Sequence, residues 1–383
     1  MEAEISVADL GEFGLIAAIR DLLPADESLT VPAGDDAAVL RIPDGRVVAT
    51  TDVLVEGRHF RRDWSGPADV GVKAAAQNLA DVAAMGARPR TLLVGLACPP
   101  GLPADWVLDM MRGIVGECVR AGASIAGGDV TAADSVMLGI TALGDLAGLA
   151  PVTRGGARPG DRVALSGRIG WSAAGFALLQ DGQGLALLQA DQGSGVLRDQ
   201  GSGLLGDDQG SGVRRDDQGS GLLREGAADR DRDRDALALV QAHLRPQPPY
   251  PAGPAAARAG ATAMIDVSDG LLADLGHIAA ASGVRIDIDE AAVPEDGPVA
   301  AAAALLGADS RDWILAGGED HALAATFPAG TQLPAGWAPL GAVAAGSGVL
   351  VDGAPRRGPG GWSHFRGGAP GLSGRGPRKV SSE

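Results

Sequence analysis

Apolar and polar positions in the first 150 residues follow two alternating patterns. Helical spacing predicts helices at residues 11–23 and 69–85, the first stopping before Pro24 and the second with Gly86 as its C-cap. Shorter apolar runs predict strands at residues 37–42, 46–50, 91–97, 124–126 and 136–143, with a further helix at 104–121. This mixture of elements predicts an α/β or α+β domain covering residues 1–150.

The same alternation resumes after residue 160. Strands are predicted at 160–165, 262–266, 284–288, 320–327 and 338–344, and helices near 172–181 and 270–281. A second α/β domain, covering residues 151–365, is the simplest account of this half.

A repetitive segment interrupts the second domain. The unit DQGSG begins at residues 191, 199, 208 and 217, and DRDRDRD follows at 229–235. Calcium-binding β-rolls also repeat every nine residues, but their glycines and aspartates are spaced differently. We interpret 183–235 as a flexible low-complexity insertion, with a folded ligand-binding repeat as the alternative. The glycine-rich residues 366–383 predict a disordered tail.

Composition narrows the class of protein. A net charge of −16 argues against nucleic-acid and anionic-membrane partners, which would need a basic face. No apolar run approaches the roughly 18 residues that span a bilayer, and the first residues lack a signal-peptide pattern. Cys98 and Cys118 have no spacing typical of zinc sites or disulfides. We therefore expect a soluble cytoplasmic protein.

Short acidic motifs, several of them beside apolar runs, are the main candidates for chemistry. They are GDDA (34–37), TTD (50–52), NLAD (78–81), GGD (127–129), DVSDG (266–270) and GGED (317–320). Each has an ordinary alternative: GDD suits a turn, and Ser268 or Asp269 suits a helix N-cap beside free backbone N–H groups that could bind an anion. Asp81, stacked with Lys73, Gln77 and Asn78, belongs to a polar stripe that could equally face solvent or a site. If the motifs converge, their charges repel by roughly 4 kcal/mol per pair at contact distance, which favours bound divalent cations and phosphates.

Several familiar catalytic patterns are missing from the sequence. Lys73 and Lys379 are its two lysines, and no GxxxxGK[ST] phosphate-binding loop occurs. Neither HExxH nor GxSxG is present, and neither cysteine has an evident base partner, so covalent catalysis has no support. If this protein binds ATP, metal ions must neutralise much of the phosphate charge.

In order and spacing these motifs resemble the thiamine-phosphate kinase family of the aminoimidazole-ribonucleotide-synthetase-like superfamily. The resemblance spans nearly everything outside the insertion and the tail, through GEF (11–13), GDDAAVL (34–40), TTDVLVEGRHF (50–60), NLADVAAMGA (78–87), GGD (127–129), TRGGA (153–157), DVSDGLLADLGHI (266–278), GGEDHAL (317–323) and GWSHF (361–365). Departures occur at Ala80, where the family usually has serine, at His321, where it has tyrosine, and in the GWSHF ending, where it has GYDHF.

The resemblance implies a fold, a reaction and a set of site residues. It implies a two-domain fold with an N-terminal mixed sheet that forms a homodimer, and phosphorylation of thiamine monophosphate by ATP with several Mg²⁺ ions. No general base is expected, because the attacking phosphate oxygen is already ionised. Carried over by motif, the Mg²⁺ ligands would be Asp36, Thr50, Thr51, Asp52, Asp81, Asp129, Asp266 and Asp269. ATP would contact Gly128, Asp129, Arg154 and Ser268, and thiamine phosphate would contact His59, Glu319 and Trp362.

Two alternatives stay open at this point. One is another ATP-using member of the superfamily. Selenophosphate synthetases normally carry a reactive cysteine or selenocysteine near the N-terminus, but this chain has no cysteine before Cys98. Hydrogenase-maturation relatives end in cysteine, whereas this chain ends in Glu383. The other is a non-catalytic scaffold that uses the DQGSG repeats to bind a partner or calcium.

Overall fold

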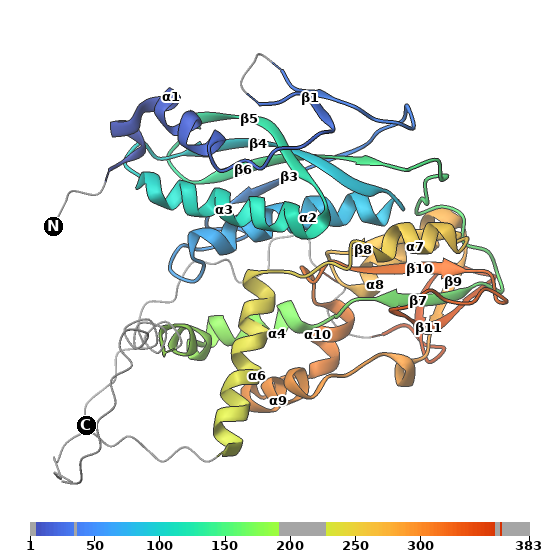
Figure 1. The fold of residues 1–383 in the computed structure, drawn as a ribbon. Coiled ribbons are helices and arrows are strands. Elements are labelled where there is room, and N and C mark those ends of the chain that lie inside the picture. The colour runs from blue at the N-terminus through green and yellow to red at the C-terminus, as the bar shows by residue number, and fades with distance from the viewer. Residues whose placement is uncertain (1–4, 34–36, 191–226, 357–360, 362–383) are drawn as a thin grey trace, which may run out of the picture.

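The computed structural model describes residues 5–33, 37–190, 227–356 and 361, which form two layered α/β domains (Figure 1). The first domain has a mixed four-stranded sheet in the order β3-β6-β4-β5, made of β3 (Val48–Val55), β6 (Met137–Asp145), β4 (Arg88–Cys98) and β5 (Ser124–Ala132). The strands β4 and β5 are parallel and the other pairs antiparallel. The predicted mixed sheet is confirmed.

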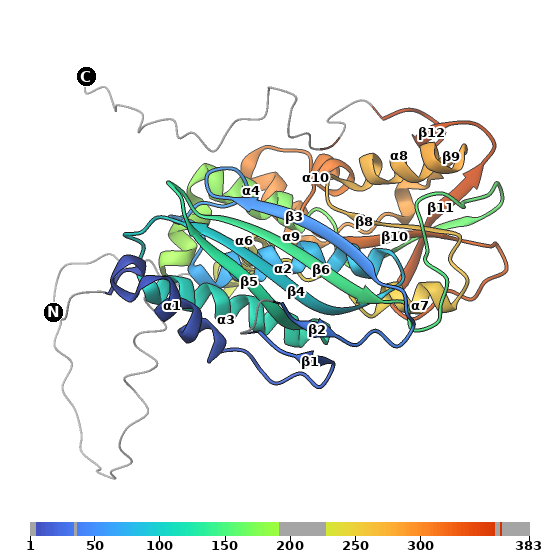
Figure 2. The same ribbon diagram turned by 90° about the horizontal axis from the view of Figure 1, so that it is seen from above.

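Helices α2 (Pro67–Ala84) and α3 (Ala104–Ala121) cover one face of this sheet, as Figures 1 and 2 show. Both match their predicted ranges within two residues. Gly86, with φ 76°, follows the last turn of α2 in the left-handed conformation that favours glycine, as predicted for a helix end. The opposite face of the sheet carries no helix over most of its area (Figure 2).

Several predicted boundaries in this domain are wrong. The first helix, α1, covers Val7–Arg20 rather than 11–23, because a Ser6–Asp9 capping box starts it earlier and a kink at Gly11 bends it. The strand predicted at 46–50 runs on to Val55, so Thr51 and Asp52 lie inside β3 rather than at its end. Likewise, Gly127–Asp129 lie within β5. The short strands β1 (Leu29–Val31) and β2 (Val39–Leu40) form a separate pair.

The second domain contains a six-stranded sheet in the order β12-β9-β11-β7-β10-β8. Its strands are β7 (Arg162–Ser166), β8 (Ala263–Val267), β9 (Arg285–Ile288), β10 (Ala322–Phe327), β11 (Trp337–Ala344) and β12 (Gly348–Val351). Its helices are α4 (Trp171–Asp181), α6 (Ala227–Leu244), α7 (Ala252–Arg258), α8 (Leu271–Ser282), α9 (Gly297–Leu306) and α10 (Ser310–Ala316). All five strands predicted from the sequence are present, whereas α6, α7, α9, α10 and β12 were not predicted.

Both ends of the insertion predicted at 183–235 are helical. Residues 183–190 are helical, and 227–235 form the start of α6, so these two stretches contradict the prediction. Charged DRDRDRD can be helical because alternating Asp and Arg place opposite charges three residues apart, as in the Asp231–Arg234 ion pair. The DQGSG repeats at 191–226 and the predicted tail at 366–383 lie outside the described residues.

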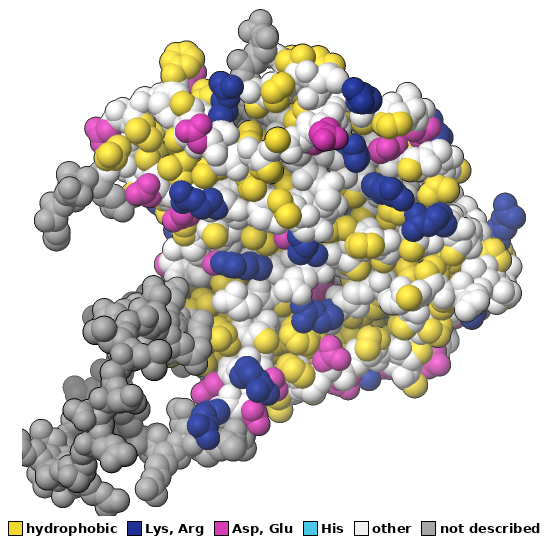
Figure 3. Space-filling model, in the orientation of Figure 1, with side chains coloured by type: hydrophobic (Ala, Val, Ile, Leu, Met, Phe, Trp, Pro, Cys, Tyr) yellow, Lys and Arg dark blue, Asp and Glu magenta, His cyan; other side chains and the backbone are white. Residues whose placement is uncertain are grey.

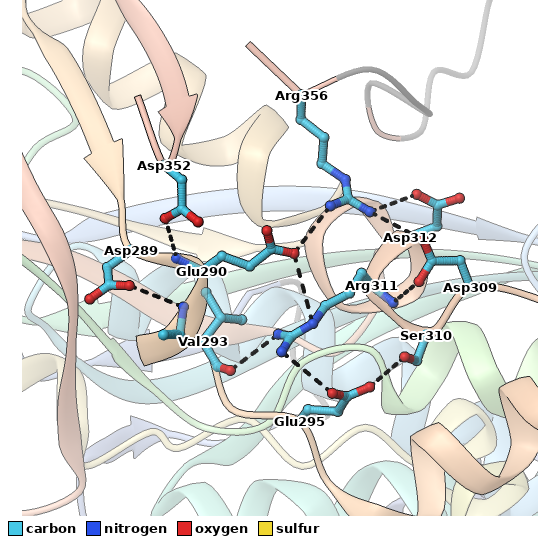
Figure 4. A network of polar contacts seen from close by, with 11 residues as sticks. Asp289, Glu290, Val293, Glu295, Asp309, Ser310, Arg311, Asp312, Asp352 and Arg356 are labelled. Atoms are coloured by element: carbon cyan, nitrogen blue, oxygen red, sulfur yellow. Dashed lines mark hydrogen bonds and ion pairs between the residues drawn. The ribbon is translucent and has the colours of Figure 1, made fainter. Parts of the chain in front are cut away.

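An ion-pair network holds the chain that follows β12 (Figure 4). Arg356 lies 3.0 Å from Asp312 Oδ1 and 3.4 Å from Glu290 Oε1, and Arg311 bridges the same Glu290 to Glu295. Gly361 lies against the first turn of α8, where an added Cβ would be 2.9 Å from the Asp269 carbonyl oxygen. The end of the described chain is therefore brought back to the DVSDG loop.

Candidate active site

One face of α2 carries polar side chains into the boundary between the domains. Lys73 and Asn78 are buried, and Asn78 Oδ1 accepts a hydrogen bond of 3.0 Å from the Asp52 backbone N–H. The Thr50 hydroxyl donates to Asp81 Oδ2 over 2.7 Å. This stripe thus faces a site rather than solvent, and the sequence alone could not decide between these possibilities.

Carboxylates from both domains gather beside Asp81. Burial, the neighbouring Asp266 on β8 and Asp52 on β3 raise the pKa of Asp81 to about 7. His321 Nδ1 lies 3.2 Å from Asp266 Oδ2; although burial opposes it, this contact raises the pKa of His321. Acids from three predicted motifs, TTD, NLAD and DVSDG, therefore do converge, and they come from elements far apart in sequence.

The GGED motif forms a strained turn between α10 and β10. Glu319 and His321 have φ values of 65° and 53°, a conformation that costs about 1 kcal/mol or more outside glycine. The three side chains after the glycines reach different elements. Glu319 contacts Lys73 of α2, Asp320 accepts from the Gly170 and Ser172 N–H groups at the start of α4, and His321 contacts Asp266. A single turn therefore aligns both domains around the site.

The DVSDG loop is capped differently from the prediction. Gly270 is the N-cap of α8, and neither Ser268 nor Asp269 caps it with a side chain. Instead, Asp274 Oδ2 accepts hydrogen bonds from the N–H groups of residues 268, 269 and 270 at 3.0, 3.0 and 3.1 Å. These N–H groups are consequently not free to bind an anion, and that expectation is wrong. Burial and the Asp266 charge raise the pKa of Asp274 to about 7.

Two predicted ligands lie on the open face of the first sheet. Residues in one register row share a face, and alternate rows face opposite ways. Asp52 lies in the row with Ile140 and Val94, which are buried under the helices, whereas Thr51 and Asp129 belong to rows facing away from α2 and α3. Within this chain, therefore, Thr51 and Asp129 are not brought to Asp81.

Gly128 has a packing explanation of its own. It lies on β5, three strands from Asp52 and about 14 Å across the sheet at the usual strand spacing. A Cβ there would meet the Val94 carbonyl oxygen at 1.9 Å, so the tight pairing of β4 and β5 alone requires glycine.

The remaining predicted residues are spread around the cluster. Arg154 is exposed, and its carbonyl accepts from Ser282 at the C-terminal end of α8, whereas Ser268 precedes the other end of this helix, which is about 18 Å long. His59 is half-buried, and its Nδ1 accepts from the Val55 N–H over 3.0 Å. Asp36 and Trp362 lie outside the described residues.

The oxygen-rich cluster suits Mg²⁺ in its donor chemistry. Buried carboxylates that raise one another's pKa favour a divalent cation, which would relieve their repulsion. Among the described residues no group of three or more His, Cys, Asp or Glu side chains has an arrangement that could hold a metal ion. A closed cage is not needed, because Mg²⁺ usually keeps several waters and binds one or two carboxylates together with substrate phosphates.

Two contributors to the site were missed from the sequence. His243, on α6, lies 3.0 Å from Ser172 Oγ and 3.5 Å from Glu319 Oε2, and burial lowers its pKa to about 3. The other is Asp274, whose carboxylate accepts the backbone hydrogen bonds of the DVSDG loop. Neither belongs to a spacing pattern that would have marked it. A hollow of about 490 Å³ beside α1, lined among others by Arg20 and Asp26, contains none of the predicted site residues and is not assigned a role.

Comparison with known proteins agrees with the geometry. The model of the AIR synthase related protein, N-terminal domain, matches residues 34–146. Thiamine-monophosphate kinase of Mycobacterium tuberculosis is 42% identical over 362 residues, covering 94% of this chain and 93% of that protein. The thiamine-monophosphate kinase of Aquifex aeolicus is 31% identical and is covered over 99% of its length.

Solved structures agree as well. AaThiL complexed with AMPPCP and TMP superposes with a TM-score of 0.66 at 31% identity, over 93% of this chain and 98% of that one. The structure of thiamine-monophosphate kinase from Stenotrophomonas maltophilia K279a gives a TM-score of 0.69 at 31% identity, over 89% and 96% of the two chains. With relatives this similar over nearly its whole length, and with acids of three motifs from both domains meeting in one cluster, the chain belongs to the thiamine-monophosphate kinase family.

Proposed function

We propose that this protein transfers the terminal phosphoryl group of ATP to thiamine monophosphate, giving thiamine diphosphate and ADP. The observation that carries the proposal is the convergence of Asp52, Asp81 and Asp266 in a member of this kinase family. The relative AaThiL, complexed with AMPPCP and TMP, supports a site for both an ATP analogue and TMP.

The chain's own residues would prepare two anionic substrates for in-line attack. The attacking phosphate oxygen is ionised at neutral pH, so the residues need only hold, orient and neutralise the reactants. Asp52, Asp81 and Asp266 would bind Mg²⁺, and the Thr50 hydrogen bond fixes which oxygen of Asp81 remains available. Bound Mg²⁺ supplies the charge screening that the sequence, without a P-loop lysine, otherwise lacks.

The other carried-over roles remain proposals. Asp36, Thr50, Thr51, Asp129 and Asp269 would complete the Mg²⁺ shell; Gly128, Asp129, Arg154 and Ser268 would contact ATP; His59, Glu319 and Trp362 would contact thiamine phosphate. Support is strongest for Glu319, because its side chain is 38% exposed and its charge acts on His321, which contacts Asp266 of the cluster.

A homodimer through the open sheet face is part of the proposal. This face exposes apolar side chains on three strands, with Val53 49%, Leu93 40% and Met137 42% exposed. Covering such a face with a second copy would bury them and would bring Thr51 and Asp129 into a shared surface. A two-fold pairing explains why predicted ligands lie on a face that this chain leaves open.

Other partners have less support. Figure 3 shows basic and acidic side chains interspersed on one face rather than gathered into a basic stripe, consistent with our proposal of no nucleic-acid partner. In the ranges that the structure describes, no helix is long and apolar enough to cross a membrane. We keep the cytoplasm as the proposed compartment, supported by Cys98 and Cys118, which are both unpaired and buried.

A direct assay tests the proposed function. Purified protein with ATP, Mg²⁺ and thiamine monophosphate should form thiamine diphosphate and ADP in equal amounts. Formation of ADP without thiamine diphosphate would favour another superfamily reaction. Absence of any turnover in folded protein would favour the scaffold alternative.

A further inference from the structure

Lys73 and Glu319 form an ion pair across the domain boundary. The Nζ–Oε2 distance is 3.0 Å, and the two side chains are 4% and 38% exposed. Burying an ammonium is strongly unfavourable unless a counter-ion offsets the loss of hydration. The buried Lys73 ammonium therefore depends on Glu319 as its counter-ion, and the Glu319 side chain is the more exposed of the two.

The contacts to Glu319 are concentrated on one oxygen. Lys73 Nζ and His243 Nδ1 both approach Oε2, at 3.0 and 3.5 Å. Within the described part of the chain we find no hydrogen bond to Oε1. Although burial works in the opposite direction, the Lys73 charge lowers the pKa of Glu319 to about 2, so the carboxylate is ionised. One oxygen is anchored while the other remains available for a ligand.

The backbone holds this arrangement against a conformational cost. Glu319 has φ 65°, and its N–H donates to the Ser268 carbonyl over 2.8 Å. The next residue, Asp320, is fixed by the Gly170 and Ser172 N–H groups at 2.6 and 2.8 Å. Strain of this kind persists where surrounding contacts over-determine it, and it often occurs at ligand-binding turns.

We propose that Lys73 is a positioning residue, which aims the Glu319 carboxylate at the thiamine part of the substrate. Thiamine phosphate carries a cationic thiazolium ring and an aminopyrimidine whose amino group donates hydrogen bonds. An oriented carboxylate oxygen complements either group. The inference rests on the proposed function, and it assigns to Lys73 recognition of the acceptor substrate rather than of ATP.

Steady-state kinetics of four variants of the full chain test this role. K73M should raise the KM for thiamine monophosphate about tenfold while the KM for ATP stays within about twofold. K73R should recover most of that loss, because it restores a cation. The double variant K73M/E319Q should be no worse than E319Q alone, since Lys73 acts through Glu319. R245M is the matched control, because Arg245 pairs with Asp69 and so breaks a different ion pair between α2 and the second domain.

The outcomes separate the two proposals. A wild-type protein with no activity on thiamine monophosphate overturns the proposed function and this inference with it. If the wild type is active, three results would overturn the inference alone. K73M could leave the KM for thiamine monophosphate unchanged, R245M could raise that KM as much as K73M does, or the effects of K73M and E319Q on that KM could be additive in the double variant. Additive losses of kcat in K73M/E319Q would also overturn the inference, because they would indicate that Lys73 contacts a phosphate rather than acting through Glu319. Thermal melting of every variant verifies folding, and K73R keeps the test decisive if K73M does not fold.

Discussion

The Thr50 hydroxyl donates a 2.7 Å hydrogen bond to Asp81 Oδ2, which joins the edge strand β3 to the middle of the candidate site. The charges of Asp266 and Asp52 act on the same Asp81 carboxylate and, together with its burial, raise its pKa to about 7. A threonine and an aspartate 31 residues apart thus set the orientation of one proposed Mg²⁺ ligand.

Replacing Asp81 with asparagine should cripple turnover. The substitution keeps the shape of the side chain but removes a charge that opposes phosphate repulsion, and we expect kcat to fall by roughly 10²–10³-fold. Assays at saturating Mg²⁺ make the comparison, with Asp105→Asn, an exposed acid in the first turn of α3, as the control. Near-normal turnover would remove Asp81 from the proposed ligands.

His243 should make the fold sensitive to acid. Its folded-state pKa of about 3 lies below the unfolded value near 6.5, so the unfolded state takes up the proton first and stability falls as pH drops from 6.5 towards 3. Between pH 6.5 and 5 this amounts to at most about 2 kcal/mol. Urea unfolding across that range should show a shallower pH slope in His243→Gln. The exposed His277→Gln should keep the wild-type slope, and equal slopes in all three proteins would contradict the assignment.

Charge placed on the open sheet face should separate the proposed dimer. Leu93→Lys puts an ammonium among the exposed apolar side chains of β4, and sedimentation should then give the mass of a monomer. Val119→Lys is the matched control, because Val119 is 64% exposed on α3, away from that face. A dimer that survives Leu93→Lys, or a wild type that is already monomeric, would place Thr51 and Asp129 outside a shared surface.

The boundaries of the insertion can be tested by two deletions. Replacing 191–226 with a short Gly-Ser linker should change the free energy of unfolding by less than about 1 kcal/mol and leave the reaction intact. Removing all of 183–235 also deletes Leu188, which is 8% exposed, and should cost about 2 kcal/mol more. Loss of activity in the shorter deletion would support the alternative of a functional repeat.

Adding a methyl group at Gly175, on α4, should destabilise the fold. A Cβ at Gly175 would lie 2.1 Å from the Leu239 carbonyl oxygen of α6, so Gly175→Ala must push the helices apart and should cost about 1–3 kcal/mol. Gly276→Ala on α8 meets nothing within 4 Å and should be neutral or slightly stabilising. Chemical unfolding of both variants measures the difference.

Sequence patterns predicted the elements with long apolar runs, such as α2, α3 and β4, because burial of such runs decides their structure. They failed where long-range contacts decide: the end of β3 depends on pairing with β6, and DRDRDRD becomes helical as part of α6, whose later turns pack on α4. In the site, Asp81 and Asp266 stand out by motif. His243 has no local signal, since it is placed by the packing of α6 against α4 and the strained Glu319.

The close contact between α4 and α6 also bears on how this chain can change over time. The backbone approach at Gly175 holds two helices close together, and these helices carry Ser172 and His243 to the site. We therefore expect changes confined to the segment joining α4 and α6 to leave the contact between Ser172 and His243 in place.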